Sequence, residues 1–131
     1  MKTNYRLALA VLAGVSIGIV GAKAMHARQV TPPAYVISEV DAMDLDGLQK
    51  YGEKVGDTLA PFNGHYHFLV GGGAKIQALD GEPPKGIVVL AFDSAEKARE
   101  WYDSPAYEAI KPIRLSATKG RMFIVEGLAP R

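Results

Sequence analysis

The chain has 131 residues, of which 48% are hydrophobic and 22% charged, a composition that fits one globular domain. It contains no cysteine, which excludes disulfides, thiolate catalysis and a lipid-modified N-terminal cysteine. The formal net charge of +1 gives no support for a nucleic-acid-binding protein, a class that needs a strongly basic surface.

The first 24 residues have the outline of a secretory signal peptide. Lys2 and Arg6 flank the start that leads into the apolar run from Leu7 to Val20, and the small-residue site Ala22-Lys23-Ala24 follows. The apolar run is shorter than the ~20 residues that span a bilayer comfortably. We therefore expect a periplasmic or secreted protein, with an uncleaved N-terminal membrane anchor as the alternative.

Cleavage after Ala24 would change the charge balance of the chain. Three of the 15 basic residues would be lost, and 12 basic against 14 acidic residues would leave a formal net charge of −2. A slightly acidic domain gives no support for binding to nucleic acid or to an anionic membrane surface. We expect neither partner once the signal peptide is removed.

The first strand of the domain is predicted directly after a linker over residues 25–33. The segment from Ala34 to Asp41 alternates in the manner of a strand, with Val36, Ser38 and Val40 on one face. We expect the domain to extend from this strand to residue 128.

A long amphipathic helix is predicted next. Asp44 is its candidate N-cap, and from Leu45 apolar residues recur at three- and four-residue steps. These residues are Leu48, Tyr51, Val55, Leu59 and Phe62. Three glycines within the stripe each cost about 1 kcal/mol relative to alanine, so the helix needs tertiary packing. Pro61 and Asn63-Gly64 are expected to end it.

The middle of the chain contains two further predicted strands. His65 to Val70 is the second strand, Gly71-Gly72-Gly73 interrupts it, and Ala74 to Leu79 is a candidate short ribbon strand. A turn at Asp80 to Pro84 then leads into Ile87 to Phe92. This continuous apolar, β-branched run is typical of a central strand that is covered on both faces.

Two helical pieces and a last strand complete the domain. Asp93, with Glu96 as its capping-box partner, is the expected cap of the first piece, and Ser104-Pro105 begins the second. Pro112 is expected to break the second helix. Arg121 to Glu126 is predicted as the closing strand.

The predicted order of elements is β-α-β-β-α-β, the α+β plan called ferredoxin-like. In this plan the helices cover one face of an antiparallel sheet. The strands Ile87 to Phe92 and Met122 to Val125 nevertheless carry apolar residues toward both faces. We therefore predict a homodimer in which two sheets pack against each other.

The motifs of the chain, taken together, resemble those of the domain of unknown function 1330 family, within the dimeric α/β-barrel superfamily, over Tyr35 to Leu128. The motifs are Pro33 to Asp41 with Asp44, Gly72-Gly73, Leu79 to Glu82, Val89 to Ala98, Trp101 with Ser104 to Tyr107, and Val125 to Gly127. The resemblance implies a ferredoxin-like protomer and a homodimer with back-to-back sheets that form a dimeric α/β barrel. It implies no established reaction.

Two departures from the family pattern bear on function. Many members carry an arginine before the glycine pair, where this chain has Gly71, so an anion site built on that arginine is not expected here. The segment from Gly64 to His67 is also richer in histidine than the usual pattern.

His65 and His67 are the weak catalytic candidates of the chain. They lie two residues apart in a predicted strand, so both imidazoles should point to one face. One could act as a general base, or the pair could bind a metal with a third ligand such as Glu39 or Asp41. The simpler interpretation is an ordinary hydrogen-bonding pair, and we expect no metal site and no cofactor.

The candidate ligand-binding residues are Trp101, Tyr107 and Arg114, which gather with Tyr102 in the second helical region. Large aromatic rings can line a cavity, and a guanidinium can hold a carboxylate or a phenolate. The alternative is that Trp101 and Tyr107 belong to the core and that Arg114 forms a surface or intersubunit ion pair.

Three functions remain open at the level of the sequence, because no strong catalytic motif appears. The first is a homodimer that binds a small organic molecule in a cleft between sheet and helices. The second is a cofactor-independent oxygenase or isomerase of the dimeric α/β-barrel type. The third is a non-catalytic interaction module of the cell envelope. Whether the protein is an enzyme is not decided by its sequence.

Export gives a first testable prediction. N-terminal sequencing of the protein isolated from its native cells should start at Met25, because Ala22-Lys23-Ala24 has the small residues that signal peptidase requires. A sequence that starts at Met1 or Lys2 would contradict cleavage, and fractionation of the membranes would then test the anchor.

Overall fold

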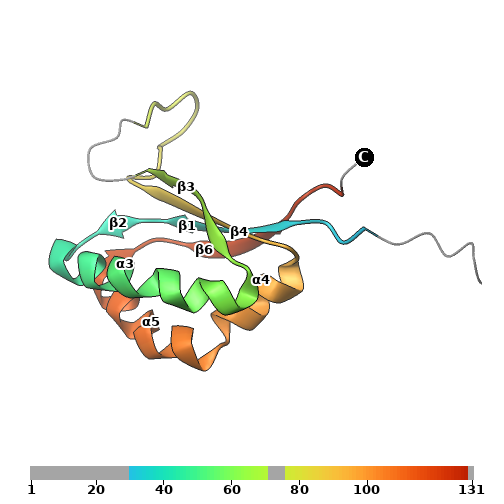
Figure 1. Ribbon diagram of the computed structural model, residues 1–131. Coiled ribbons are helices and arrows are strands. Elements are labelled where there is room, and N and C mark those ends of the chain that lie inside the picture. Colours follow the sequence, from blue (N-terminus) through green and yellow to red (C-terminus); the bar gives the residue numbers. More distant parts are fainter. Residues whose placement is uncertain (1–29, 71–75, 130–131) are drawn as a thin grey trace, which may run out of the picture.

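The computed structural model describes residues 30–70 and 76–129, which form a four-stranded antiparallel sheet with three helices on one face (Figure 1). The strands are β1 (Ala34–Glu39), β3 (His65–Val70), β4 (Ile87–Phe92) and β6 (Met122–Glu126), and they lie in the order β3-β4-β1-β6. The expected ferredoxin-like protomer, with β4 inside the sheet, is confirmed. The predicted signal peptide and the Gly71-Gly72-Gly73 interruption lie outside the described residues.

The helices are α3 (Leu45–Leu59), α4 (Ala95–Tyr102) and α5 (Pro105–Ala117). Two short strands, β2 (Asp41–Ala42) and β5 (Thr118–Lys119), pair with each other next to the first and last of these helices. No helix within the described ranges is long and apolar enough to cross a membrane.

The two faces of the sheet differ because only one is covered by helices. On the helix face, Val36 lies opposite Leu90 and Ile124 in the neighbouring strands. On the other face, called the open face from here on, Ile37 lies opposite Val89 and Phe123. The first set is buried or nearly so, whereas Phe123 is 41% exposed. The alternation expected for β1 is thus observed.

Helix α3 begins and ends where the sequence predicts. The Asp44 side chain accepts a hydrogen bond from the Gly47 amide, which satisfies one of the free amides of the first turn. The helix ends at Leu59, a 3-10 turn covers Ala60–Phe62, and Asn63 adopts a left-handed backbone conformation with φ of 54°.

The expected cap of α4 is wrong by one residue. Ser94, and not Asp93, caps the helix by accepting a hydrogen bond from the Lys97 amide. The Asp93 carboxylate instead accepts a hydrogen bond of 2.8 Å from the side-chain amide of Asn63. The Asp93 side chain, which the local pattern assigned to the cap of α4, is therefore engaged in a tertiary contact with Asn63, just after α3 and its 3-10 turn.

The predicted break at Pro112 is also wrong, because α5 runs through it from Pro105 to Ala117. Proline removes one backbone hydrogen bond and costs about 3 kcal/mol inside a helix. Ile110 and Arg114, on either side of Pro112, are buried against the rest of the fold. We attribute the continuity of α5 to this packing.

The candidate ribbon strand Ala74 to Leu79 begins outside the described residues, and its described part, residues 76–79, is not a strand. The nearby chain contains Gly81 with φ of +72°, Pro83 and Pro84, none of which favours strand pairing.

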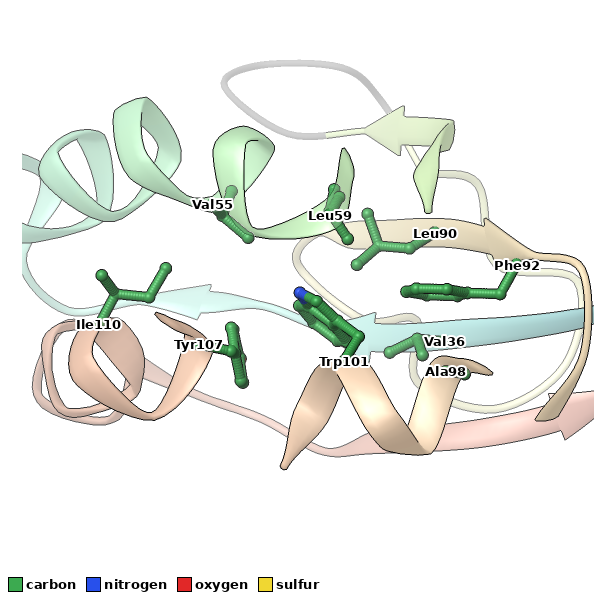
Figure 2. Packing of buried hydrophobic residues seen from close by; sticks show 9 residues of the cluster. All are labelled: Val36, Val55, Leu59, Leu90, Phe92, Ala98, Trp101, Tyr107 and Ile110. Carbon is green, nitrogen blue, oxygen red and sulfur yellow. The ribbon is translucent and has the colours of Figure 1, made fainter. Parts of the chain in front are cut away.

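The core is an aromatic cluster between the sheet and the helices (Figure 2). The Trp101 ring is fully buried, and its centroid lies 4.2 Å from that of Tyr107 and 5.5 Å from that of Phe92. The indole nitrogen donates a hydrogen bond of 2.9 Å to the Thr58 hydroxyl, which in turn donates one of 2.7 Å to the Val55 carbonyl. The only polar atom of the indole is thus satisfied inside the core.

The link between Trp101 and Thr58 gives a prediction on stability. Thr58→Val keeps the shape of the side chain but leaves the buried indole N–H without an acceptor, so we expect a loss of about 1–3 kcal/mol in the free energy of unfolding. The measurement is urea unfolding at one protein concentration. In a Trp101→Phe background the same change should cost much less, because no indole N–H remains. Equal losses in the two backgrounds would contradict the proposed role of Thr58.

Candidate functional site

A cavity of about 870 Å³ opens between the helix face of the sheet and α3. Most of the side chains that line it are apolar. The lining residues are Ser38, Val40, Asp41, Ala42, Leu45, Leu48, Tyr51, Gly52, Val55, Tyr66, Lys85, Gly86, Val88, Leu90, Arg114, Thr118 and Met122. Leu45 and Lys85 are well exposed to solvent and mark the open end.

The cavity lies beside the aromatic cluster, where the residues between sheet and helix become small. Trp101, Tyr107 and Phe92 occupy one part of the layer between the sheet and the helices. The cavity wall, by contrast, includes the small residues Ser38, Ala42, Gly52, Gly86 and Thr118. A Cβ placed on Gly52 would meet no atom within 4 Å, so this part of α3 faces open space. The change in side-chain size leaves the volume unfilled.

Three polar side chains meet where the cavity reaches the aromatic cluster. The Tyr107 hydroxyl accepts a hydrogen bond of 3.0 Å from the Nε of Arg114 and lies 3.1 Å from the Tyr51 hydroxyl. Its oxygen is also 4.0 Å from the sulfur of Met122. Tyr51 and Arg114 line the cavity, while Tyr107 is fully buried behind them. The tyrosine therefore fixes the guanidinium in the cavity wall.

The tyrosine hydroxyls of the cavity stay neutral at physiological pH. Burial raises the pKa of Tyr51 far above its ordinary value of 10, and the neighbouring Tyr107 hydroxyl raises it further, while the charge of Arg114 acts in the opposite direction. Burial also raises the pKa of Tyr66. Both hydroxyls can therefore donate a hydrogen bond to a bound molecule.

Arg114 is 9% exposed and has no carboxylate partner among the described residues. All 14 aspartate and glutamate residues lie within residues 30–70 and 76–129, and none forms an ion pair with it. At the open end of the cavity, by contrast, the Lys85 ammonium is 3.0 Å from the Asp41 carboxylate. Arg114 is thus the one cationic side chain of the cavity wall that lacks a counter-charge.

The structure brings together two of the three ligand-binding candidates. Tyr107 and Arg114 are hydrogen-bonded at the cavity, whereas Trp101 is a core residue that does not line it. Sequence reasoning missed Tyr51, Tyr66 and Ser38 as cavity residues. The sequence signal that could have identified Tyr51 was its position in the apolar stripe of α3, directly before Gly52.

His65 and His67 share a face of the sheet, as expected, but it is the open face. His65 lies opposite Ala91, and the ring of His67 contacts that of Tyr35 with centroids 5.4 Å apart. An irregularity in the pairing between Tyr66 and Phe68 accompanies this arrangement. Neither histidine lines the cavity.

The described residues contain no group of three or more histidine, aspartate or glutamate side chains that could hold a metal ion. Glu39, one of the two suggested third ligands, instead forms a two-pronged ion pair with Arg121, at 2.7 and 2.9 Å. This ion pair, through its hydrogen bond, lowers the pKa of the Glu39 carboxyl.

Comparison with known proteins places the fold. The sequence model of the family described as Domain of unknown function (DUF1330) matches residues 33–128. Among solved structures, a protein of unknown function from Rhodopseudomonas palustris superposes with a TM-score of 0.61 at 14% identity, covering 86% of this chain and 94% of that one. No curated protein sequence matches the chain significantly.

Two further solved structures share the fold at low sequence identity. SnoaB, a cofactor-independent oxygenase from Streptomyces nogalater, gives a TM-score of 0.53 at 10% identity, over 77% of this chain and 96% of that one. A hypothetical protein of Arabidopsis thaliana gives 0.51 at 16% identity, over 77% and 89% of the two chains. At such identities the likeness concerns the protomer fold alone, which is the ferredoxin-like fold described above.

Proposed function

The chain belongs to the family described as Domain of unknown function (DUF1330), and from its geometry we propose a homodimer in which each protomer binds a small organic molecule in the cavity between the sheet and α3. The cavity carries this proposal. Its volume of about 870 Å³ is within the range of small-molecule sites, about 300–1,000 Å³. Its wall combines apolar side chains with few polar groups, which is the usual composition of such sites.

The open face of the sheet supports the homodimer. Tyr35, Ile37 and Val89 lie on it in adjacent strands and are half-buried, and Phe123 and Val125 in the edge strand are 41% and 39% exposed. Such a continuous apolar face on one side of a sheet is a common site of association. We propose that a second copy of the chain covers it, sheet against sheet.

Binding, and not catalysis, is the function that the geometry favours. A cofactor-independent oxygenase or isomerase that works by general-base catalysis would require a base near the bound molecule. The histidines suggested for that role lie on the open face, on the other side of the sheet from the cavity. The shared fold alone does not carry a reaction from one protein to another.

We further propose that the domain works outside the cytoplasm after removal of residues 1–24. The sequence of that segment is the support for export. Binding of small organic molecules in the envelope is compatible with a domain that holds no cysteine and needs no reducing environment.

Filling the cavity tests the binding function. Gly52→Phe places a ring where a Cβ meets no atom within 4 Å, and helical side chains lean toward the N-terminus of their helix, here toward Leu48. We expect affinity for the neutral fluorescent probe phenylnaphthylamine to fall at least tenfold. Stability should not fall, since glycine costs about 1 kcal/mol in a helix.

Gly52→Ala is the matched control for this substitution, because it adds the helix propensity but little volume. It should bind the probe as the wild type does. Probe binding that is equally strong in Gly52→Phe, or absent from the wild type, would contradict a binding site in the cavity. Mass spectrometry of the purified protein under native conditions then identifies any molecule that it retains.

Val89→Asp tests the homodimer. The change places a charge in the middle of the open face, where a sheet-to-sheet interface would bury it without a partner. We expect light scattering at micromolar concentration to give a dimer mass for the wild type and a monomer mass for the variant. Ala109→Asp, on the exposed side of α5, should remain dimeric. A monomeric wild type would refute the proposed dimer.

A further inference from the structure

We propose that the cavity selects organic monoanions, namely molecules with an apolar body and one carboxylate, sulfonate or similar acid group that pairs with Arg114. This inference rests on the proposed function, because it names the class of molecule that the cavity binds. Its first support is the burial of a guanidinium that pairs with none of the aspartate and glutamate side chains, all of which the structure describes.

A buried charge without a partner is costly, and proteins as a rule pair or hydrogen-bond such groups. Arginine stays protonated in proteins, so Arg114 cannot escape this cost by losing its proton. All 14 acidic side chains are placed by the structure, and none reaches its guanidinium. A bound anion would supply the missing charge.

The geometry of the guanidinium leaves donors available to such an anion. The Nε of Arg114 is committed to the Tyr107 hydroxyl at 3.0 Å. Among the described residues, no buried side-chain nitrogen or oxygen lacks a partner, and the two terminal nitrogens of Arg114 form no hydrogen bond with any of these residues. These nitrogens therefore reach accessible surface, and since Arg114 is nearly buried and lines the cavity, that surface is the cavity wall. Two parallel N–H groups suit the two oxygens of an acid group.

A neutral donor stands next to the guanidinium. The Tyr51 hydroxyl lines the cavity and lies 3.1 Å from the Tyr107 hydroxyl. When Tyr107 donates its proton to the oxygen of Tyr51, the proton of Tyr51 is directed to another acceptor, which the acid group of a ligand can provide. The same end of the cavity thus offers one cation and one hydroxyl donor to an anion.

The other charged residues of the cavity wall limit the ligand to one negative charge. Asp41 and Lys85 at the open end form an ion pair of 3.0 Å and neutralise each other. Apart from that pair and Arg114, the wall has no charged side chain and is mostly apolar, with residues such as Leu48, Val88 and Leu90. A second acid group on the ligand would lie against these side chains without a partner, at the cost of its hydration. The body of the ligand is therefore apolar.

Two fluorescent probes of almost the same shape test this inference on the purified protein. Anilinonaphthalene sulfonate and phenylnaphthylamine share their ring skeleton, and only the first carries an acid group. We expect the wild type to bind the sulfonate about ten- to hundredfold more tightly, the range of a hydrogen bond to a charged group. Arg114→Gln should remove this preference and leave the affinity for phenylnaphthylamine within about twofold.

Lys50→Gln is the charge-matched control, because Lys50 is an exposed cation of α3 that does not line the cavity. It should keep the preference of the wild type. Gly52→Phe should weaken the binding of both probes. This result would place the bound probes in the cavity and not on an exposed surface.

The outcomes separate this inference from the function on which it rests. Tight binding of phenylnaphthylamine without any preference for the sulfonate would overturn the monoanion class and leave the binding site standing. Binding of neither probe would overturn both. Equal loss of the two probes in Arg114→Gln would show that the arginine acts on the structure alone. The comparison of the two probes on the wild type needs no variant, so it stands even if Arg114→Gln fails to fold.

Discussion

The packing of Trp101 between the sheet and the helices is the contact on which the rest of the structure depends. The ring is fully buried against Phe92 and Tyr107, and its nitrogen is satisfied by Thr58 of α3. One bulky residue of α4 therefore holds together the sheet, the first helix and the beginning of the last one (Figure 2). Beside Trp101, small residues such as Gly52 do not fill the space between the sheet and α3, and a cavity remains.

Tyr107 couples this core to the proposed site. Its ring belongs to the buried cluster, while its hydroxyl contacts Arg114 and Tyr51 in the cavity wall. A buried tyrosine usually needs a polar partner for its hydroxyl. Here the requirement is met by Arg114 and Tyr51, the residues of the proposed site, so the core fixes the position of the guanidinium.

The one-sided cover of the sheet divides the roles of its two faces. The helix face carries the core and the cavity, and the open face carries apolar residues together with His65 and His67. Binding and association would then use opposite faces of the same strands. A substitution such as that of Val89 can therefore act on one role with little direct effect on the other.

The sequence by itself determined the order of the elements, the limits of α3 and the alternating faces of β1, because caps, proline, glycine and apolar periodicity act over a few residues. It also grouped Tyr107 and Arg114 in one helical region, but their contact needs the continuous α5, in which residues seven apart lie on the same side. Only the tertiary structure decided that Ser94 replaces Asp93 as a cap and that α5 continues through Pro112. It alone decided that the histidines face away from the cavity, that Trp101 belongs to the core, and that Tyr51 joins Arg114. The reason is physical: these outcomes depend on contacts between residues far apart in the chain, such as Asn63 with Asp93 and Tyr51 with Tyr107, whose energies exceed the local preferences read from neighbouring residues.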